Sequence, residues 1–193
     1  MSTTTQDLTR TVDGATVPAV GKWVIDGSHT SAEFVARHLM VTKVRGGFDS
    51  IAGTVEVAED PTNSVVEVTI DTASVVTGDA ERDGHLKSAD FFDVENYPEM
   101  KFVSTGVHAT GSSWKLDGDL TIKDITKPVT LDFDFAGVVT DPWGNQKSAF
   151  SATTTINRED WDLNWNVALE AGGVLVSKKV TIEIEMQAVP ANS

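Results

Sequence analysis

The run Val129-Thr130-Leu131-Asp132-Phe133-Asp134-Phe135 decides the fold of this chain, because apolar and polar residues alternate along its whole length. Side chains of a β-strand point alternately to the two faces of a sheet, so this run predicts a half-buried strand. The same alternation returns in residues 54–57, 66–71, 115–122, 150–156 and 180–188. Such strands with little helical sequence between them predict an all-β fold.

Turn-forming residues separate these runs, as in Asp60-Pro61-Thr62-Asn63 and Asp141-Pro142-Trp143-Gly144-Asn145. Short links of this kind imply that neighbouring strands are antiparallel. If the last run is extended from Val174 to Val189, it spans roughly 50 Å at about 3.3 Å per residue. A strand of that length is expected to coil around a closed barrel.

One crowded segment, Arg82–Asp93, does not alternate and is the place for a short helical cap over the barrel. Asp79 is a weak start for a helix, because Arg82 stands where a capping box has an acid or a glutamine. Ser88 is the better start, since Asp90 would place negative charge in the first helical turn. We therefore expect the helix to begin at Ser88.

The chain of 193 residues shows no break in composition, which predicts one domain. We expect a flexible or loosely docked N-terminal arm over residues 1–21, a barrel over 22–189 and a short tail over 190–193. Residues 1–21 lack the charged and apolar regions of a signal peptide, so a cytoplasmic location is expected. No apolar run is long enough to span a bilayer, which predicts that there is no stable membrane anchor.

The formal net charge is −14, a field that repels phosphate backbones and anionic lipid headgroups. From the net charge we expect neither nucleic-acid nor peripheral membrane binding. Since the chain has no cysteine, disulfides and thiolate metal sites are excluded.

Catalytic patterns are weak. Ser28 and His29 with Asp26 or Asp83 supply the residue types of a hydrolase triad, but adjacent residues on one strand point to opposite faces. The four histidines lack the short spacings of a zinc site. We expect no enzyme activity, no metal and no cofactor.

A set of landmarks follows in order along residues 22–189: Trp23-Val24-Ile25-Asp26, Ser28-His29-Thr30, Arg37-His38-Leu39-Met40, Val44-Arg45-Gly46-Gly47-Phe48, Arg82-Asp83-Gly84-His85-Leu86, Asp90-Phe91-Phe92, Tyr97-Pro98, Gly118-Asp119-Leu120-Thr121-Ile122, Thr126-Lys127-Pro128-Val129 and Ile156-Asn157-Arg158. This ordered set resembles the YceI-like family of polyisoprenoid-binding, lipocalin-like proteins. The chain departs from that family's pattern near position 162, where a glycine would be expected and Asp162 stands.

The resemblance implies an extended eight-stranded antiparallel lipocalin-like barrel with a short helical cap. It also implies an elongated internal pocket for a long-chain isoprenoid lipid or an isoprenoid quinone, bound as a ligand. Bulky apolar residues are the candidate pocket wall: Phe34, Phe48, Phe91, Phe102, Phe133, Phe135 and Phe150. Periodicity alone leaves a pocket and a solid core equally open, since a barrel of about eight strands can be filled by its own side chains.

Several polar residues are candidates for contact with a ligand headgroup at the pocket mouth, above all His38, His85 and Arg158. His29, Arg37 and Arg82 are of the same kind. The alternative is that these side chains fix loops of the barrel, as such residues do more often.

Three functions remain open. The first is binding, storage or transport of the isoprenoid ligand, and the second is a solid-core barrel that acts as a protein-interaction module. A weaker third is an isomerase or hydrolase of such lipids that uses His29, His85 or Arg158. A homodimer through an open strand edge is a further prediction.

Overall fold

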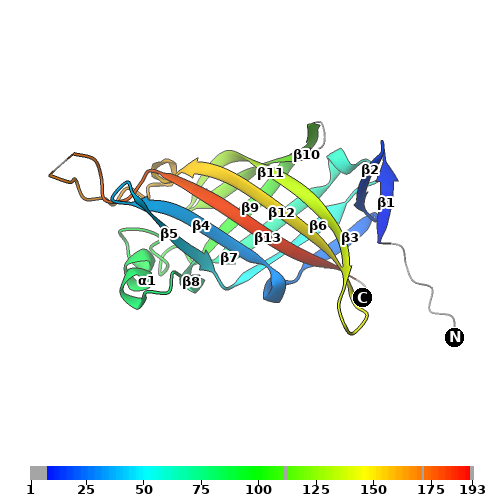
Figure 1. Ribbon diagram of the computed structural model, residues 1–193, viewed down its shortest axis with the longest axis horizontal. Helices are drawn as coiled ribbons and strands as arrows, with labels where there is room; N and C mark the ends of the chain where they lie inside the picture. The colour runs from blue at the N-terminus through cyan, green and yellow to red at the C-terminus, as the bar shows by residue number, and fades with distance from the viewer. Residues whose placement is uncertain (1–7, 111–112, 171, 192–193) are drawn as a thin grey trace.

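The computed structural model describes residues 8–110, 113–170 and 172–191, and it shows an elongated, closed antiparallel barrel (Figure 1). Strand β13 pairs with both β12 and β3, which closes the circle. The barrel therefore confirms the eight-stranded antiparallel fold. Its strands are β3 (Gly21–Ile25), β6 (Ile51–Val57), β7 (Val65–Asp71), β9 (Glu99–Thr110), β10 (Ser113–Ile122), β11 (Ile125–Thr140), β12 (Gln146–Asn157) and β13 (Lys179–Pro190).

The predicted alternation sets which side chains face inward. Phe133 of β11 pairs with Ala152 of β12, and Phe135 pairs with Phe150. Leu131 pairs with Leu116 on the other side of β11 and is buried. Apolar residues of neighbouring strands thus share the inner face, as the period of two requires.

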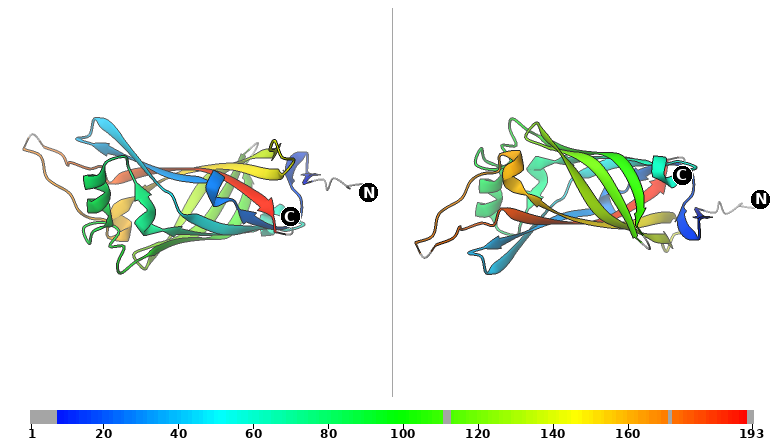
Figure 2. Two further views of the ribbon diagram at one scale, coloured as in Figure 1. Left: turned by 90° about the horizontal axis from the view of Figure 1, so that it is seen from below. Right: turned by 90° about the horizontal axis from the view of Figure 1, so that it is seen from above.

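A three-stranded wing widens the barrel toward one end (Figure 2). The first part of β13, over residues 181–185, pairs with β4 (Ser31–His38), whereas its end pairs with β3. The short 3-10 helix η1 (Gly27–His29) lets the chain turn from β3 into β4. Strand β4 pairs with β5 (Thr42–Phe48), and β5 pairs with β8 (Val75–Val76), the two-residue outer edge of the wing.

The N-terminal segment differs from the loosely docked arm that we expected. Strands β1 (Thr9–Val12) and β2 (Ala15–Pro18) form a hairpin across the end of the barrel opposite α1 (Figure 1). Leu8 and Val17 are buried, and Leu8 packs with Trp23 and Ala188. Burial of these apolar side chains holds the hairpin in place, which short strands alone would not do. Residues 1–7 of the predicted arm lie outside the described residues.

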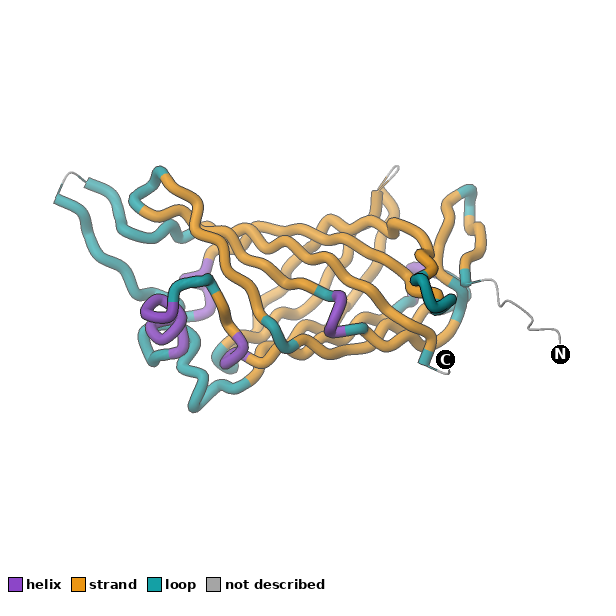
Figure 3. Tube along the Cα trace, turned by 60° about the horizontal axis from the view of Figure 1, so that its bottom comes forward, coloured by secondary structure: helices purple, strands orange, loops and turns teal. Residues whose placement is uncertain are grey.

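The helical cap is confirmed, but its predicted start was wrong. Helix α1 spans Ala80–Lys87, and its N-cap is Asp79, whose carboxylate accepts a hydrogen bond from the Arg82 backbone amide at 2.9 Å. Ser88 ends the helix: its backbone amide and hydroxyl both donate to the His85 carbonyl. One good cap bond is enough to start a helix without a capping box. Figure 3 shows α1 at the same end as the loops that follow β4 and β12.

The last strand is shorter than predicted, because β13 begins at Lys179 and not at Val174. Residues 174 and 176 form isolated bridges with Ala168 and His38, so the chain before β13 belongs to a projecting loop. Three more 3-10 helices connect strands: η2 (Pro61–Asn63), η3 (Thr72–Ser74) and η4 (Arg158–Trp161). Asp162, at the end of η4, has φ of 56°, so an aspartate here adopts the left-handed conformation that favours glycine.

Candidate functional site

An apolar cavity of about 310 Å³ lies inside the barrel, and its walls come from both ends of the molecule. Leu86 of α1 and Leu163 line it at the helical end, while Val17 and Pro18 of β2 line it at the hairpin end. The barrel therefore has a hollow interior that is lined by different elements at its two ends.

Aromatic rings form the middle of the wall. The rings of Phe135 and Phe150 lie with their centroids 5.2 Å apart, and those of Trp114 and Phe133 lie 6.3 Å apart. Phe102 also lines the cavity and covers the backbone at Gly118, where a Cβ atom would lie 2.3 Å from the Phe102 ring. A glycine is thus required at that point, because any larger residue would overlap the Phe102 ring.

A second group of rings lies under the helix. Phe48 packs between Phe34 and Phe92, with centroid distances of 5.9 Å and 5.5 Å. Phe91 is buried beside them and packs at 5.5 Å against Trp165. These contacts tie the wing, the helical cap and the loop after η4 into one apolar cluster.

The structure brings the seven predicted phenylalanines to the cavity wall: Phe34, Phe48, Phe91, Phe102, Phe133, Phe135 and Phe150. Of the predicted polar residues, Arg158 lines the cavity, whereas His38 and His85 are absent from its lining. The His85 ring packs edge-on against Trp165 at 4.6 Å, and its Nε2 lies 2.9 Å from an Asp90 carboxylate oxygen. Contact of any of these residues with a ligand stays a prediction.

Arg158 is buried, with 4% of its surface exposed, and its guanidinium contacts backbone carbonyls. Its Nε donates to Ser177 at 3.0 Å, and its Nη atoms donate to Leu163 and Val176. Burial lowers the pKa of Arg158 from its ordinary value. These contacts hold both ends of the loop over residues 163–177 against the barrel, so the geometry favours the loop-fixing alternative for this residue.

Some wall residues were not predicted from the sequence, among them Trp114, Phe92 and Val17. Trp114 continues the inward-facing set of β10, so strand alternation could have identified it. Phe92 stands next to a predicted residue in the cap and was identifiable as an apolar neighbour. Val17 could not be identified in this way, because each strand of its hairpin has only four residues, too few to show a clear alternation.

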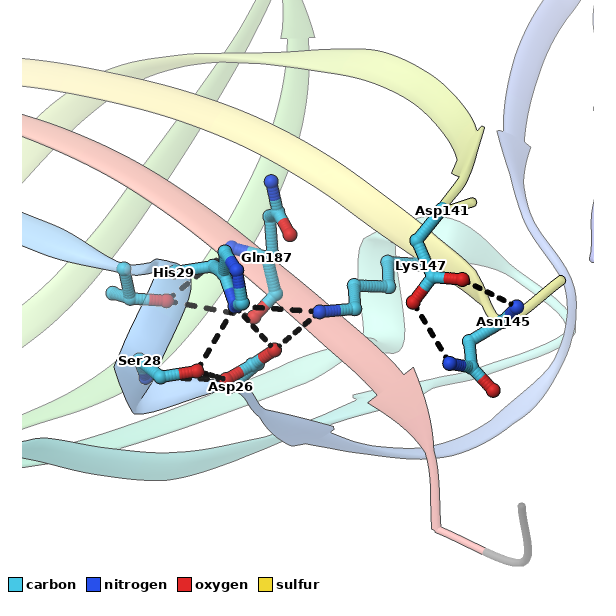
Figure 4. A network of polar contacts seen from close by, with 8 residues as sticks. Asp26, Ser28, His29, Asp141, Asn145, Lys147 and Gln187 are labelled. Carbon is cyan, nitrogen blue, oxygen red and sulfur yellow. Dashed lines mark hydrogen bonds and ion pairs between the residues drawn. The ribbon is translucent and has the colours of Figure 1, made fainter. Parts of the chain in front are cut away.

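A polar cluster joins η1 to β12 on the outside of the barrel (Figure 4). Asp26 accepts hydrogen bonds from Lys147 Nζ at 2.6 Å and from the Ser28 hydroxyl at 2.6 Å. The Lys147 ammonium first, and then the Ser28 hydroxyl, hold the pKa of Asp26 well below its usual range. This cluster fixes the turn between β3 and β4 to a strand that lies far away in the sequence.

The expectation that Ser28 and His29 point to opposite faces was wrong, because both lie on η1 and not on a strand. The Ser28 hydroxyl lies 2.9 Å from His29 Nδ1, and the Asp26 carboxylate lies 3.0 Å from the same nitrogen. A catalytic triad places its acid and its nucleophile on different ring nitrogens. The three side chains are therefore not arranged as a triad.

The described part of the chain holds neither a candidate metal cluster nor a helix that could cross a membrane. No three or more histidine, cysteine, aspartate or glutamate side chains gather there in a group that could hold a metal ion. Over residues 8–110, 113–170 and 172–191, none of the helices has the length and apolar character needed to cross a membrane. The predicted cytoplasmic location stays a prediction.

A closed antiparallel barrel with an apolar interior and a helical cap defines a lipocalin-like protein. The family model of the YceI-like domain matches residues 23–188, so the chain belongs to the YceI-like family. A UPF0312 protein of Staphylococcus aureus (strain MSSA476) is 42% identical over 163 residues, which cover 83% of this chain and 93% of the relative.

Solved structures share the fold. BcnA of Burkholderia cenocepacia has a TM-score of 0.71 at 22% identity, covering 84% of this chain and 98% of that one. The YCEI protein of Campylobacter jejuni has a TM-score of 0.65 at 28% identity, covering 78% and 87%. A polyisoprenoid binding domain from Saccharophagus degradans has a TM-score of 0.66 at 14% identity, covering 89% and 99%.

Proposed function

We propose that this protein binds a long-chain isoprenoid lipid or an isoprenoid quinone inside the barrel, and that it stores or carries this ligand. The observation that carries the proposal is the apolar cavity, whose wall extends from the helical cap to the N-terminal hairpin. A solid-core barrel would have no such cavity, so the structure does not favour the protein-interaction alternative.

The energy of burial is sufficient for this role. Burying about ten methylene equivalents is worth roughly 8 kcal/mol before ordering costs, which corresponds to about micromolar affinity. A long isoprenoid therefore needs no charged anchor inside the barrel. Aromatic walls such as those formed by Phe133, Phe135 and Phe150 suit a branched, unsaturated chain, because they offer large contact area with few rotatable bonds.

The fold comparison supports the same class of ligand. The Saccharophagus degradans domain is described as binding a polyisoprenoid, and it has the same barrel. At 14% identity that similarity concerns the scaffold, so the choice of ligand rests on the residues of this chain.

The first test is native mass spectrometry of protein purified without detergent, followed by organic extraction and identification of the bound molecule. We expect a stoichiometric isoprenoid or quinone, or uptake of one on incubation. A mass that stays ligand-free after incubation with such lipids would argue against the proposal.

A pair of variants assigns uptake to the cavity. Ala152 lines the cavity, whereas its neighbour Thr153 is exposed on the outside of the same strand. Ala152→Phe should fill part of the cavity and reduce lipid uptake about tenfold or more, as the loss of two or more buried methylene groups implies. Thr153→Phe places the same side chain outside and should leave uptake unchanged.

A further inference from the structure

An apolar projection stands at the helical end of the barrel. We define the tip as the β4–β5 turn, residues 37–43, together with the described parts of the loop that follows η4, residues 163–170 and 172–177. Leu39, Met40 and Val41 are 46%, 53% and 74% exposed, and Val167 is 46% exposed. Figure 1 shows the loop reaching beyond α1, with the β4–β5 turn at the same end.

The two segments of the tip are joined by the backbone. The Leu39 amide donates to the Leu175 carbonyl at 2.8 Å, and the Ser177 amide donates to the Arg37 carbonyl at 2.9 Å. Arg158 holds the base of the loop from inside the barrel through the carbonyls of Val176 and Ser177. The exposed side chains are therefore presented by a supported structure.

The turn carries backbone strain at its apolar residues. Leu39 and Met40 have φ of 52° and 60°, and the Val41 amide donates to the His38 carbonyl at 3.1 Å. Positive φ at both central residues is the geometry of a type I′ turn, which strongly favours Asn-Gly. Two bulky apolar residues are unfavourable there, and strained positions tend to mark sites of function.

The charge of the tip is opposite to that of the molecule. Residues 37–43 contain Arg37 and Lys43 and no acidic residue, whereas the loop carries the acid Glu170. The tip thus has a formal charge of +1 in a chain whose net charge is −14. Helix α1, which carries Glu81 and Asp83, lies at the same end of the barrel, and the loop extends past it (Figure 1).

We propose that the tip docks transiently on a bilayer surface that contains anionic lipids. Leu39, Met40 and Val41 enter the boundary between headgroups and acyl chains, and Arg37 and Lys43 face the lipid phosphates. From the net charge we expected no peripheral membrane binding. The cations of the tip lead to the opposite expectation for this part of the surface.

A bilayer fits this surface better than a protein partner does. A stable protein interface buries about 800 Å² on each partner. Two narrow segments with four exposed apolar side chains do not form a broad face, whereas interfacial binding needs only a few inserted side chains and nearby cations.

Docking would bring the cavity to the membrane. Ala36 and Val176, at the base of the tip, both line the cavity. Exchange of a lipid between bilayer and barrel by this route rests on the proposed function, but docking of the tip does not depend on it.

The test is flotation of the full chain with vesicles of phosphatidylcholine alone and of phosphatidylcholine mixed with phosphatidylglycerol. We expect binding to the mixed vesicles at low ionic strength and a loss of binding as salt is added. The double variant Leu39→Asn, Met40→Gly should lose at least about tenfold in vesicle affinity, since two inserted side chains are gone. Because Asn-Gly suits the turn, its thermal midpoint should be unchanged or higher, so weak binding cannot be attributed to unfolding.

Two matched variants separate the contributions. Lys43→Glu should weaken binding to the mixed vesicles about fivefold or more, because a cation near an anionic surface is replaced by an anion. Trp143→Ser removes a side chain that is 84% exposed in the turn at the opposite end of the barrel, and it should leave vesicle binding unchanged.

Four results would overturn the proposal: no flotation of the wild-type chain at low salt, full binding by the double variant, loss of binding in Trp143→Ser, or self-association that the double variant abolishes. The last would make the tip an interface between copies of the chain.

Two variants distinguish docking from lipid uptake. Ala152→Phe should retain vesicle binding while losing lipid uptake, and the double variant should retain uptake of lipid supplied from detergent. Failure of docking and failure of the cavity proposal are thereby distinguished.

Discussion

At the scale of single residues, the ion pair between Asp26 and Lys147 links the turn after β3 to strand β12, across 121 positions in the sequence. The side chains are 19% and 12% exposed, so solvent screens the pair less than a surface ion pair. Asp26 also caps η1 through the Ser28 amide. One carboxylate therefore holds both the turn and the neighbouring strand.

Asp26→Asn should lower the free energy of unfolding at pH 7 by about 2 kcal/mol, because a charge-assisted hydrogen bond is lost. The pKa of Asp26 is lower in the folded protein than in the unfolded chain, so its stabilisation is complete above the unfolded value of about 3.9 and disappears as pH falls through the folded value. Urea unfolding of both proteins at pH 7 and at about pH 3 measures this. The prediction is contradicted if the difference in free energy of unfolding between the wild type and Asp26→Asn is larger at the lower pH.

Arg158→Met should destabilise the protein by about 2–4 kcal/mol, because three backbone carbonyls lose their buried donor. Limited proteolysis should then cut the loop over residues 163–177 faster than in the wild type. Arg37→Met, at an exposed position of β4, is the control and should have little effect on stability. If Arg158 binds a ligand headgroup instead, lipid affinity will fall much more than stability does.

At the scale of elements, the N-terminal hairpin is a part of the barrel that strand patterns did not indicate. It lies across the end opposite α1 (Figure 1), and its residues Val17 and Pro18 line the cavity. The cap and the hairpin therefore contribute the wall at the two ends of the cavity.

Leu8→Ala tests whether the hairpin contributes to stability. Leu8 is buried against Trp23, so its truncation should cost about 2–3 kcal/mol in the free energy of unfolding. Thr16→Ala, on the exposed face of the same hairpin, should change it by less than about 0.5 kcal/mol. Equal stability of the two variants would mean that the hairpin is only loosely attached in solution.

At the scale of the whole molecule, a ligand that fills the cavity should stabilise the folded state. At a hundredfold excess over Kd the gain is about 2.7 kcal/mol, which raises Tm by roughly 5–10 °C for a chain of this size. In a series of isoprenoid alcohols of increasing length, the gain should rise with each buried unit and level off when the cavity is full. Thermal denaturation with each alcohol measures the rise in Tm and its dependence on the chain length of the alcohol. A rise in Tm that does not depend on chain length would contradict burial along the barrel.

Much of the barrel could be predicted because strand alternation is a local property. Residues 129–135 show their inner face directly, and the same holds for residues 150–156. The start of α1 could not be predicted as well, since Asp79 and Ser88 are both good capping residues and only the packed structure selects one. The predicted β13 boundary was wrong for a similar reason: residues 174–178 are apolar enough for a strand, but Val176 pairs with His38 of the wing and Val174 pairs with Ala168 of the loop itself.

The sequence by itself determined the all-β class, the antiparallel barrel, its family and the aromatic residues of the inner face, because period-two patterning and ordered motifs are written along the chain. Only the tertiary structure decided that the interior is hollow, that Arg158 donates hydrogen bonds to the carbonyls of a loop and that Asp26 meets Lys147. It alone joined the β4–β5 turn to the loop before β13 as one projection. The physical reason is that cavities, buried hydrogen bonds and composite surfaces depend on distances between residues far apart in the chain, and these distances are set only when the barrel closes.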